Sequence, residues 1–77
     1  LINLKELYLN NNQIEYVPTE IGELINLKQL ELSNNEIKLI PEEIKKLINL
    51  QILDLTYNKI ELAQFNTNVL KNIKCFS

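Results

Sequence analysis

The chain repeats itself every 23 residues. The block Leu-Ile-Asn-Leu begins at Leu1, returns at Leu24 and Leu47, and has a degenerate fourth copy that begins at Leu70. A fixed period of about 20–50 residues is typical of stacked units, none of which can bury its apolar face alone. The spacing predicts one array, with repeats at 1–23, 24–46 and 47–69 and a partial repeat or cap at 70–77.

Each unit reads as a short strand, an asparagine turn and a return segment. Leu7 and Leu9 alternate with polar neighbours, which is the period of two that a strand produces. Residues 10–12 are all asparagine, whose side chain competes with helix by bonding nearby backbone groups. Pro18 and Pro41 suit the first turn of a short α- or 3₁₀-helix, because proline lacks an N–H that stays unpaired there.

One motif runs through the chain in three copies that keep the same phase. The copies are Leu7-x-Leu9-x-x-Asn12-x-Ile14, Leu30-x-Leu32-x-x-Asn35-x-Ile37 and Leu53-x-Leu55-x-x-Asn58-x-Ile60. The chain thereby resembles the leucine-rich repeat family, and its Pro-x-x-Ile return segment resembles the intracellular type of repeat. The resemblance implies an α/β repeat solenoid, a right-handed superhelical arc with parallel strands on the concave face and short helices on the convex face. It also implies that partners bind the concave face.

Under this fold the repeated letters form the scaffold. The leucines of each strand are expected to stack on those of the next unit, at Leu7, Leu30 and Leu53 for example. We expect one asparagine column to form a ladder that satisfies backbone groups; its members are Asn12, Asn35 and Asn58. We expect a second column to form turns before the strands; its members are Asn3, Asn26, Asn49 and Asn72.

The residues between the inward leucines should face solvent on the concave side. Partner binding is therefore predicted at Glu6, Tyr8, Asn10, Gln29, Glu31, Ser33, Ile52, Asp54, Thr56 and Tyr57. Tyr8 and Tyr57 are the best candidate anchors, because tyrosine gives large contact area at low entropic cost. One column across the strands is expected to read Tyr8, Glu31, Asp54 and Ser77. Adjacent acidic side chains repel each other unless nearby cations neutralise them, so this column favours a protein partner with a basic segment. The alternative is that the column is an acidic strip that only water solvates.

Three further features belong to this arrangement. A second column, expected to read Lys5, Lys28, Gln51 and Lys74, would partly balance the acids. One column of isoleucines is predicted to form an exposed apolar ridge; its members are Ile2, Ile25 and Ile48. The alternative is that these isoleucines only reflect a composition rich in Ile, Asn and Lys. Cys75 is expected in the column of Glu6, Gln29 and Ile52, as an incidental thiol rather than a nucleophile.

The third unit departs from the pattern after Ile60. Gln64 stands where the other units have proline, and Thr67 stands where an apolar residue is expected. Phe65, Val69 and Phe76 are expected to supply the missing apolar volume. Residues 61–77 therefore form either a C-terminal cap or a degenerate repeat.

Composition argues against catalysis, cofactors and nucleic acid. The chain has no histidine, so no Ser-His or Cys-His pair and no common zinc site is expected. Its one glycine, Gly22, excludes a phosphate-cradling loop, and so short a solenoid is expected to offer no deep cleft. The net charge of -2 comes with eight lysines and no arginine, unlike a nucleic-acid reader. We expect neither an enzyme nor a membrane-spanning segment.

The single cysteine rules out an internal disulfide, and the twelve asparagines include no Asn-x-Ser/Thr glycosylation acceptor. Both observations favour an intracellular, cytoplasmic location. The chain contains no methionine, which suggests an excerpt of a longer protein. Unpaired strand edges at both ends predict that the isolated chain is marginally stable or associates end to end.

Two functions remain open at this point. The first is a protein-interaction module, in signal transduction for instance, that uses the concave face. The second is a recognition or spacer segment of a larger signalling enzyme, such as a kinase, GTPase or ubiquitin ligase, whose catalytic domain lies outside this chain. A repeat remnant without a function of its own is a third reading.

Overall fold

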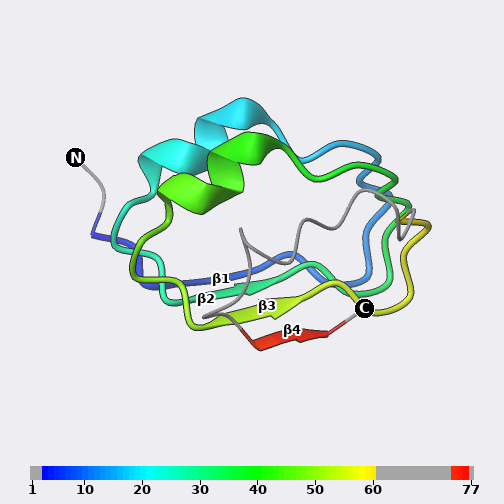
Figure 1. Cartoon of the computed structure of the whole chain (residues 1–77). Helices are drawn as coiled ribbons and strands as arrows, with labels where there is room; N and C mark the ends of the chain where they lie inside the picture. Colours follow the sequence, from blue (N-terminus) through cyan, green and yellow to red (C-terminus); the bar gives the residue numbers. More distant parts are fainter. Residues whose placement is uncertain (1–2, 61–73, 77) are drawn as a thin grey trace.

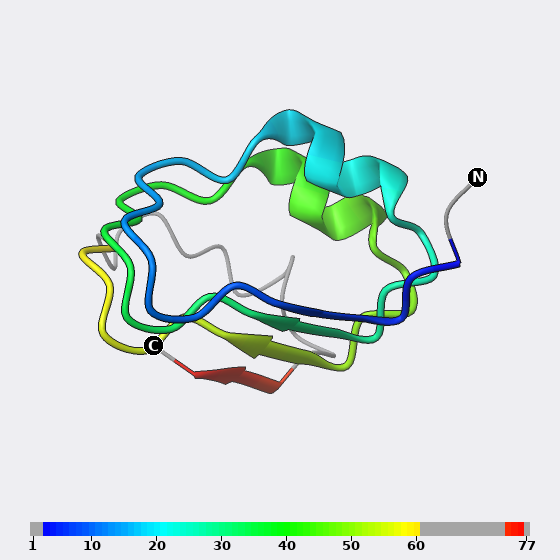
Figure 2. The same ribbon diagram turned by 180° about the vertical axis from the view of Figure 1, so that it is seen from behind.

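The structure, a computed structural model, describes residues 3–60 and 74–76. Four strands form one parallel sheet in chain order: β1 (Glu6–Tyr8), β2 (Gln29–Glu31), β3 (Ile52–Asp54) and β4 (Lys74–Phe76). Two 3₁₀-helices, η1 (Thr19–Glu23) and η2 (Glu42–Lys46), lie side by side on the opposite side of the coils from the sheet (Figure 1). The repeat units stack on one another, with the sheet along one side of the stack and the helices along the opposite side, as Figure 2 shows from behind. This is the predicted α/β repeat solenoid.

Each helix begins immediately after its proline. Pro18 has φ -68° and ψ 152°, and its carbonyl accepts a hydrogen bond of 3.1 Å from the Ile21 N–H. Pro41 and Ile44 repeat this arrangement at 3.1 Å. The helices are therefore of the 3₁₀ type, whose short runs with bonds between residues three apart are well known. Each proline occupies the capping position before the helix and not the first turn, because its extended ψ places it outside the helix.

The leucine stacks of the predicted scaffold form the core. Leu27, Leu30 and Leu53 are fully or almost fully buried, and the helices add Ile21 and Ile44 from the other side. The first unit is less covered: Leu7 and Leu9 are partly buried, and Leu4 is 37% exposed. Each unit thus buries its leucines only where another unit lies against it, which is the behaviour expected of a stacked repeat.

The asparagine ladder is present as predicted. Asn35 accepts from the Ile14 N–H through Oδ1 at 3.1 Å and donates through Nδ2 to the Leu9 and Leu32 carbonyls at 3.0 and 2.9 Å. Asn58 makes the same bonds one unit later, accepting from Ile37 N–H and donating to the Leu32 and Leu55 carbonyls, among others. Each amide therefore joins its own turn to the unit before it.

The second asparagine column lies in the turns before the strands. Asn26 Nδ2 donates to Asn3 Oδ1 at 3.5 Å, and Asn49 Nδ2 donates to the Ile25 carbonyl at 3.0 Å. The predicted turn role holds for Asn26 and Asn49, which both lie in turns. Asn72 lies outside the described residues.

The register of β4 differs from the expectation. Lys74 pairs with Ile52, Cys75 with Leu53 and Phe76 with Asp54. The pairing of Gln29 with Ile52 spans 23 residues, whereas that of Ile52 with Lys74 spans 22. The connection is one residue shorter than the repeat, and a slip of one residue exchanges the register positions of a strand.

Three predicted columns are corrected by this register. Phe76, not Ser77, follows Tyr8, Glu31 and Asp54. Cys75 shares the register position of the leucines, not that of Glu6, Gln29 and Ile52. Lys74 takes that position and does not continue the column of Lys5, Lys28 and Gln51.

Several sequence predictions fall on residues that the structure does not describe. They concern Ile2, Gln64, Phe65, Thr67, Val69 and Ser77. The described members of the isoleucine column are exposed, Ile25 by 53% and Ile48 by 81%. Over the described ranges, no helix combines the length and apolar character that crossing a membrane requires.

Candidate protein interface on the concave face

The ten predicted concave residues all reach the surface. Glu6, Tyr8 and Tyr57 are exposed and the other seven are half-buried. The pairing of the strands aligns Glu6 with Gln29 and Ile52, and Tyr8 with Glu31 and Asp54. The first three strands therefore bring the predicted side chains together in columns, with neighbouring strands about 4.8 Å apart.

The Glu31 carboxylate is held by two amide side chains. Asn10 Nδ2 donates to Glu31 Oε1 at 3.1 Å, and Gln29 Nε2 donates to Glu31 Oε2. Asn10 is itself fixed, because its Oδ1 accepts from the Ser33 N–H at 2.7 Å and from Ser33 Oγ at 2.8 Å. Neutral donors thus orient Glu31 without neutralising its charge.

The Asp54 carboxylate is oriented in a similar way by its own turn. Asp54 Oδ1 accepts from the Thr56 N–H at 3.0 Å and from Thr56 Oγ1 at 2.8 Å. Asp54 and Glu31 share a register position on adjacent strands. Two oriented carboxylates therefore lie side by side in the centre of the concave face.

No lysine among residues 3–60 forms an ion pair with either carboxylate. Across residues 3–60 the structure contains one ion pair, from Lys59 Nζ to Glu36 Oε1 at 3.6 Å. Like charges opposite each other on neighbouring strands are destabilising. A cation supplied from outside would relieve that repulsion.

Tyr8 borders the acidic pair and is 53% exposed. Partial desolvation, then the charges of Glu6 and Glu31 and a hydrogen bond with Glu6, raise the pKa of the Tyr8 phenol above its ordinary value of 10.0. The phenol therefore stays protonated at neutral pH. It presents an O–H group and a ring face beside two carboxylates.

Tyr57 has an unusual backbone conformation. Its φ of 57° is left-handed, as are those of Asn11 at 63° and Asn34 at 57°, the matching positions of the other units. Asparagine tolerates this region far better than tyrosine does. Tyr57 also has no share in the bond of 2.8 Å that joins Asn34 Nδ2 to Asn11 Oδ1. Tyr57 is 82% exposed. Burial of its side chain therefore does not offset the cost of its left-handed backbone conformation.

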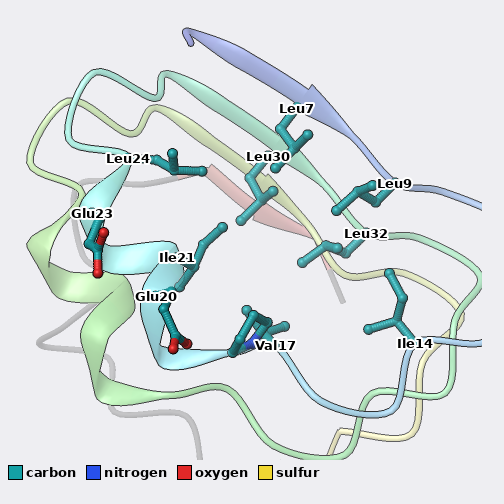
Figure 3. A pocket seen from close by; sticks show the side chains of 11 residues that line it. Leu7, Leu9, Ile14, Val17, Glu20, Ile21, Glu23, Leu24, Leu30 and Leu32 are labelled. Carbon is teal, nitrogen blue, oxygen red and sulfur yellow. The ribbon is translucent and has the colours of Figure 1, made fainter. Parts of the chain in front are cut away.

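A pocket opens at the end of the array beside β1 (Figure 3). Its volume is about 580 Å³, within the range of about 300–1,000 Å³ typical of ligand sites. The walls are almost wholly apolar: Leu7, Leu9, Ile14, Val17, Pro18, Ile21, Leu24, Leu30 and Leu32, with Glu20 and Glu23. The sequence analysis did not predict this hollow, which lies beside the first of the described units.

The described residues contain little that suggests catalysis. The titratable side chains of the pocket are Glu20 and Glu23, and its lining includes no Ser, Thr, Cys or Lys. Within the described ranges, no group of three or more His, Cys, Asp or Glu residues lies close enough to hold a metal ion. The candidate site is therefore the concave face, where the residues predicted to bind a partner lie.

Comparison with known proteins agrees with this geometry. A family model described as "Leucine rich repeat" matches residues 2–60, and a second model of that description matches residues 49–74. No curated protein matches the sequence.

A solved structure of a leucine-rich repeat protein from Leptospira interrogans is similar, with a TM-score of 0.92 and 38% sequence identity. The alignment covers 97% of this chain and 20% of that one, so this chain spans about a fifth of the length of the protein it matches. The match over residues 2–60, together with the stacked strands and the asparagine ladder, shows that the chain belongs to the leucine-rich repeat family.

Proposed function

We propose that this chain is a protein-interaction module that binds its partner through the concave face. Leucine-rich repeats are typically scaffolds for protein interaction and typically not catalytic. The observation that carries the proposal is the pair of oriented carboxylates, Glu31 and Asp54, on adjacent strands, with which no lysine among residues 3–60 forms an ion pair. Such a pair is costly in isolation and favourable opposite a basic group.

The partner is expected to offer a basic segment to this pair. A lysine or arginine would exchange its water for the carboxylates of Glu31 and Asp54, which neighbouring amides already orient. Tyr8 and Tyr57 would serve as aromatic anchors at the margin, where rings contribute contact area and attract cations. The contact surface would comprise Glu6, Tyr8, Asn10, Gln29, Glu31, Ser33, Ile52, Asp54, Thr56 and Tyr57.

The setting of this module is part of the proposal. One cysteine and no glycosylation acceptor support an intracellular, cytoplasmic location. We extend the proposal to a role in signalling, which this setting and the broad, polar surface of the described strands support.

Affinity capture with a matched control tests the proposed face. The variant Tyr8→Ala/Glu31→Lys/Asp54→Lys changes the concave face, and Tyr16→Ala/Glu15→Lys/Glu42→Lys makes the same chemical changes elsewhere on the surface. Capture from cell extract, quantified by mass spectrometry, should lose its specific partner with the first variant and keep it with the second. Unchanged partner recovery by the first variant would refute the proposal.

An alternative role is a recognition or spacer segment of a larger signalling enzyme, such as a kinase, GTPase or ubiquitin ligase. The length of the Leptospira interrogans protein, of which the alignment covers 20%, supports a longer array more than it supports an enzyme. Sequencing the full reading frame separates the two roles: a catalytic motif beside the array would favour the enzyme.

A further inference from the structure

The side of the stack that leads from the helices to the strands carries two exposed isoleucines. Segments 24–28 and 47–51 run there from η1 and η2 to β2 and β3 (Figure 1). Ile25 and Ile48 lie in turns at matching positions of these segments, and both are more than half exposed. Their units lie inside the sheet, since β2 and β3 each pair with a strand on both sides. An uncovered end of the array therefore does not explain their exposure.

Hydrogen bonds keep the two turns in register. Asn49 Nδ2 donates to the Ile25 carbonyl at 3.0 Å, and the Gln51 N–H donates to the Lys28 carbonyl at 2.8 Å. Ile25 and Ile48, the isoleucine ridge, are therefore held near the strand spacing of about 4.8 Å. Residues on one face of a helix lie about 5–6 Å apart, whereas alternate residues of a strand lie about 6.6 Å apart. A helix laid along the stack thus fits the ridge better than an extended segment does.

This side of the stack is basic, although the chain as a whole is acidic. Residues 3–5, 23–28 and 45–51 contain four of the six lysines in residues 3–60 and one of the nine acidic residues. All five side chains are exposed; they are Lys5, Lys28, Lys45, Lys46 and Glu23. Across residues 3–60 the one ion pair joins Lys59 to Glu36, so none of these four lysines takes part in it. An acidic partner would therefore meet opposite charge around the ridge.

The opposite side of the stack differs in charge. Its segments, 9–17, 32–40 and 55–60, contain two residues of each sign: Glu15, Glu36, Lys38 and Lys59. Tyr16 and Leu39 pair there in a β-bridge and are also more than half exposed. An exposed apolar pair thus occurs on both sides, but a net positive charge accompanies only the isoleucine ridge.

We propose that the isoleucine ridge and its lysines form a second interaction surface, for an acidic amphipathic helix of a partner protein. The apolar stripe of the helix would lie on Ile25 and Ile48, and its carboxylates would face Lys28 and Lys45. This surface is separate from the concave face and does not rest on the function proposed for that face.

The residues of this side favour such a helix over two other occupants. Two copies of the chain packed ridge against ridge would place lysines opposite lysines. Aromatic residues commonly anchor a protein at a bilayer interface, and the tyrosines at positions 8, 16 and 57 lie outside the segments of this side.

Fluorescence anisotropy with a synthetic helix tests the surface directly. The probe is a labelled peptide of about 18 residues, with leucine at every third or fourth position and glutamate beside that stripe. Ile25→Ser/Ile48→Ser should weaken its binding by at least about tenfold. The matched variant Tyr16→Ser/Leu39→Ser removes an exposed apolar pair from the opposite side and should leave the affinity unchanged. Equal effects of the two variants would overturn the proposal.

The lysines are tested by reversing their charge. Lys28→Glu/Lys45→Glu should weaken binding of the acidic probe by about tenfold and strengthen binding of a probe with lysine in place of glutamate. Lys38→Glu/Lys59→Glu makes the same change of charge on the opposite side and should leave both affinities unchanged. No binding of the acidic probe to the unaltered chain would overturn the proposal.

Two controls examine the helical mode and the position of the probe. Proline in the middle of the acidic probe breaks its helix and should abolish binding, so equal binding of the proline probe would overturn the proposal. Tyr8→Ala/Tyr57→Ala should leave the affinity unchanged, because these residues belong to the concave face. Loss of binding with this variant would place the helix on the concave face and would also overturn the proposal.

Sedimentation tests the two other occupants. The chain and Ile25→Ser/Ile48→Ser should behave alike, both alone and with vesicles of phosphatidylcholine and phosphatidylserine. Self-association that Ile25→Ser/Ile48→Ser abolishes would assign the ridge to a second copy. Vesicle binding that this variant abolishes would assign the ridge to a membrane surface. Either result would overturn the proposal.

Discussion

Asn12, Asn35 and Asn58 occupy the same place in three consecutive units but have different surroundings. Asn35 is buried and bonds three carbonyls and one N–H, in two units. Asn12 is exposed and bonds only carbonyls of its own turn, Leu9 and Asn10. An asparagine therefore joins two units at position 35, whereas at position 12 it bonds only its own turn.

Replacing the two asparagines separately should show this difference. Asn35→Ala leaves the Ile14 N–H without its partner and removes one of two donors from the Leu9 and Leu32 carbonyls, so it should lower the free energy of unfolding by about 2 kcal/mol. Asn12→Ala should cost less than about 1 kcal/mol, since water reaches its partners. Urea denaturation followed by circular dichroism measures both values. Equal losses would contradict the view that the ladder joins one unit to the next.

Tyr57 offers a stabilising substitution. Tyr57→Asn places the residue of the other two units at a left-handed φ of 57°, and should raise stability by about 1 kcal/mol. Tyr57→Phe keeps both the ring and the strain and should change little. Thermal melts should shift upward by about 4–8 °C for Tyr57→Asn only. A lower melting temperature for Tyr57→Asn would show that the ring contributes to the fold and not to binding.

At the scale of elements, η1 and η2 pack so closely at Gly22 that a side chain there would be crowded. A Cβ added at Gly22 would lie 3.0 Å from the Glu43 carbonyl oxygen and 3.1 Å from Glu43 Cβ. Gly22 has no positive φ, so its role is close approach and not conformational freedom.

Gly22→Ala should therefore destabilise the chain. Because a backbone oxygen cannot yield without moving η2, the expected loss is about 1–2 kcal/mol. Lys45 holds the matching position on η2 and is exposed, so Lys45→Ala should change stability by less than about 0.5 kcal/mol. Chemical denaturation of both variants measures the contrast. A neutral Gly22→Ala would show that the helices separate readily.

The elements that sequence reasoning could predict are those whose residues carry the repeat. Alternation around Leu7 and Leu9 predicts β1, and the prolines mark where η1 and η2 begin. The register of β4 could not be predicted, since it depends on the length of a connection whose residues no longer follow the motif. The close packing at Gly22 could not be predicted, because a contact between two helices produces no recognisable pattern in a single sequence.

The candidate site shows the same division. The ten concave residues follow from the alternation, and strand pairing aligns six of them in two columns, Glu6 with Gln29 and Ile52, and Tyr8 with Glu31 and Asp54. The bonds that orient Glu31 and the left-handed φ of Tyr57 could not be predicted, because side-chain and backbone angles are not periodic features. The pocket beside β1 could not be predicted, because no motif of the repeat marks it.

At the scale of the whole molecule, the residues that form the core differ from those that we propose for binding. The recurring leucines and asparagines fill the core and the ladder, while the varying residues face solvent on the sheet. A chain of this kind can change its partner without changing its fold, because the two sets of side chains do not contact the same groups. The central claim is therefore that the varying concave residues contact the partner.

The chain's three tyrosines allow that claim to be measured directly. Tyr8 and Tyr57 lie on the proposed face, whereas Tyr16, 70% exposed, lies on the return segment opposite Leu39. A photo-reactive phenylalanine analogue replacing each in turn, followed by irradiation in cell extract and mass spectrometry, reports what each position touches. Positions 8 and 57 should cross-link to one common protein, and position 16 should not. A partner cross-linked from position 16, with none from positions 8 and 57, would contradict it.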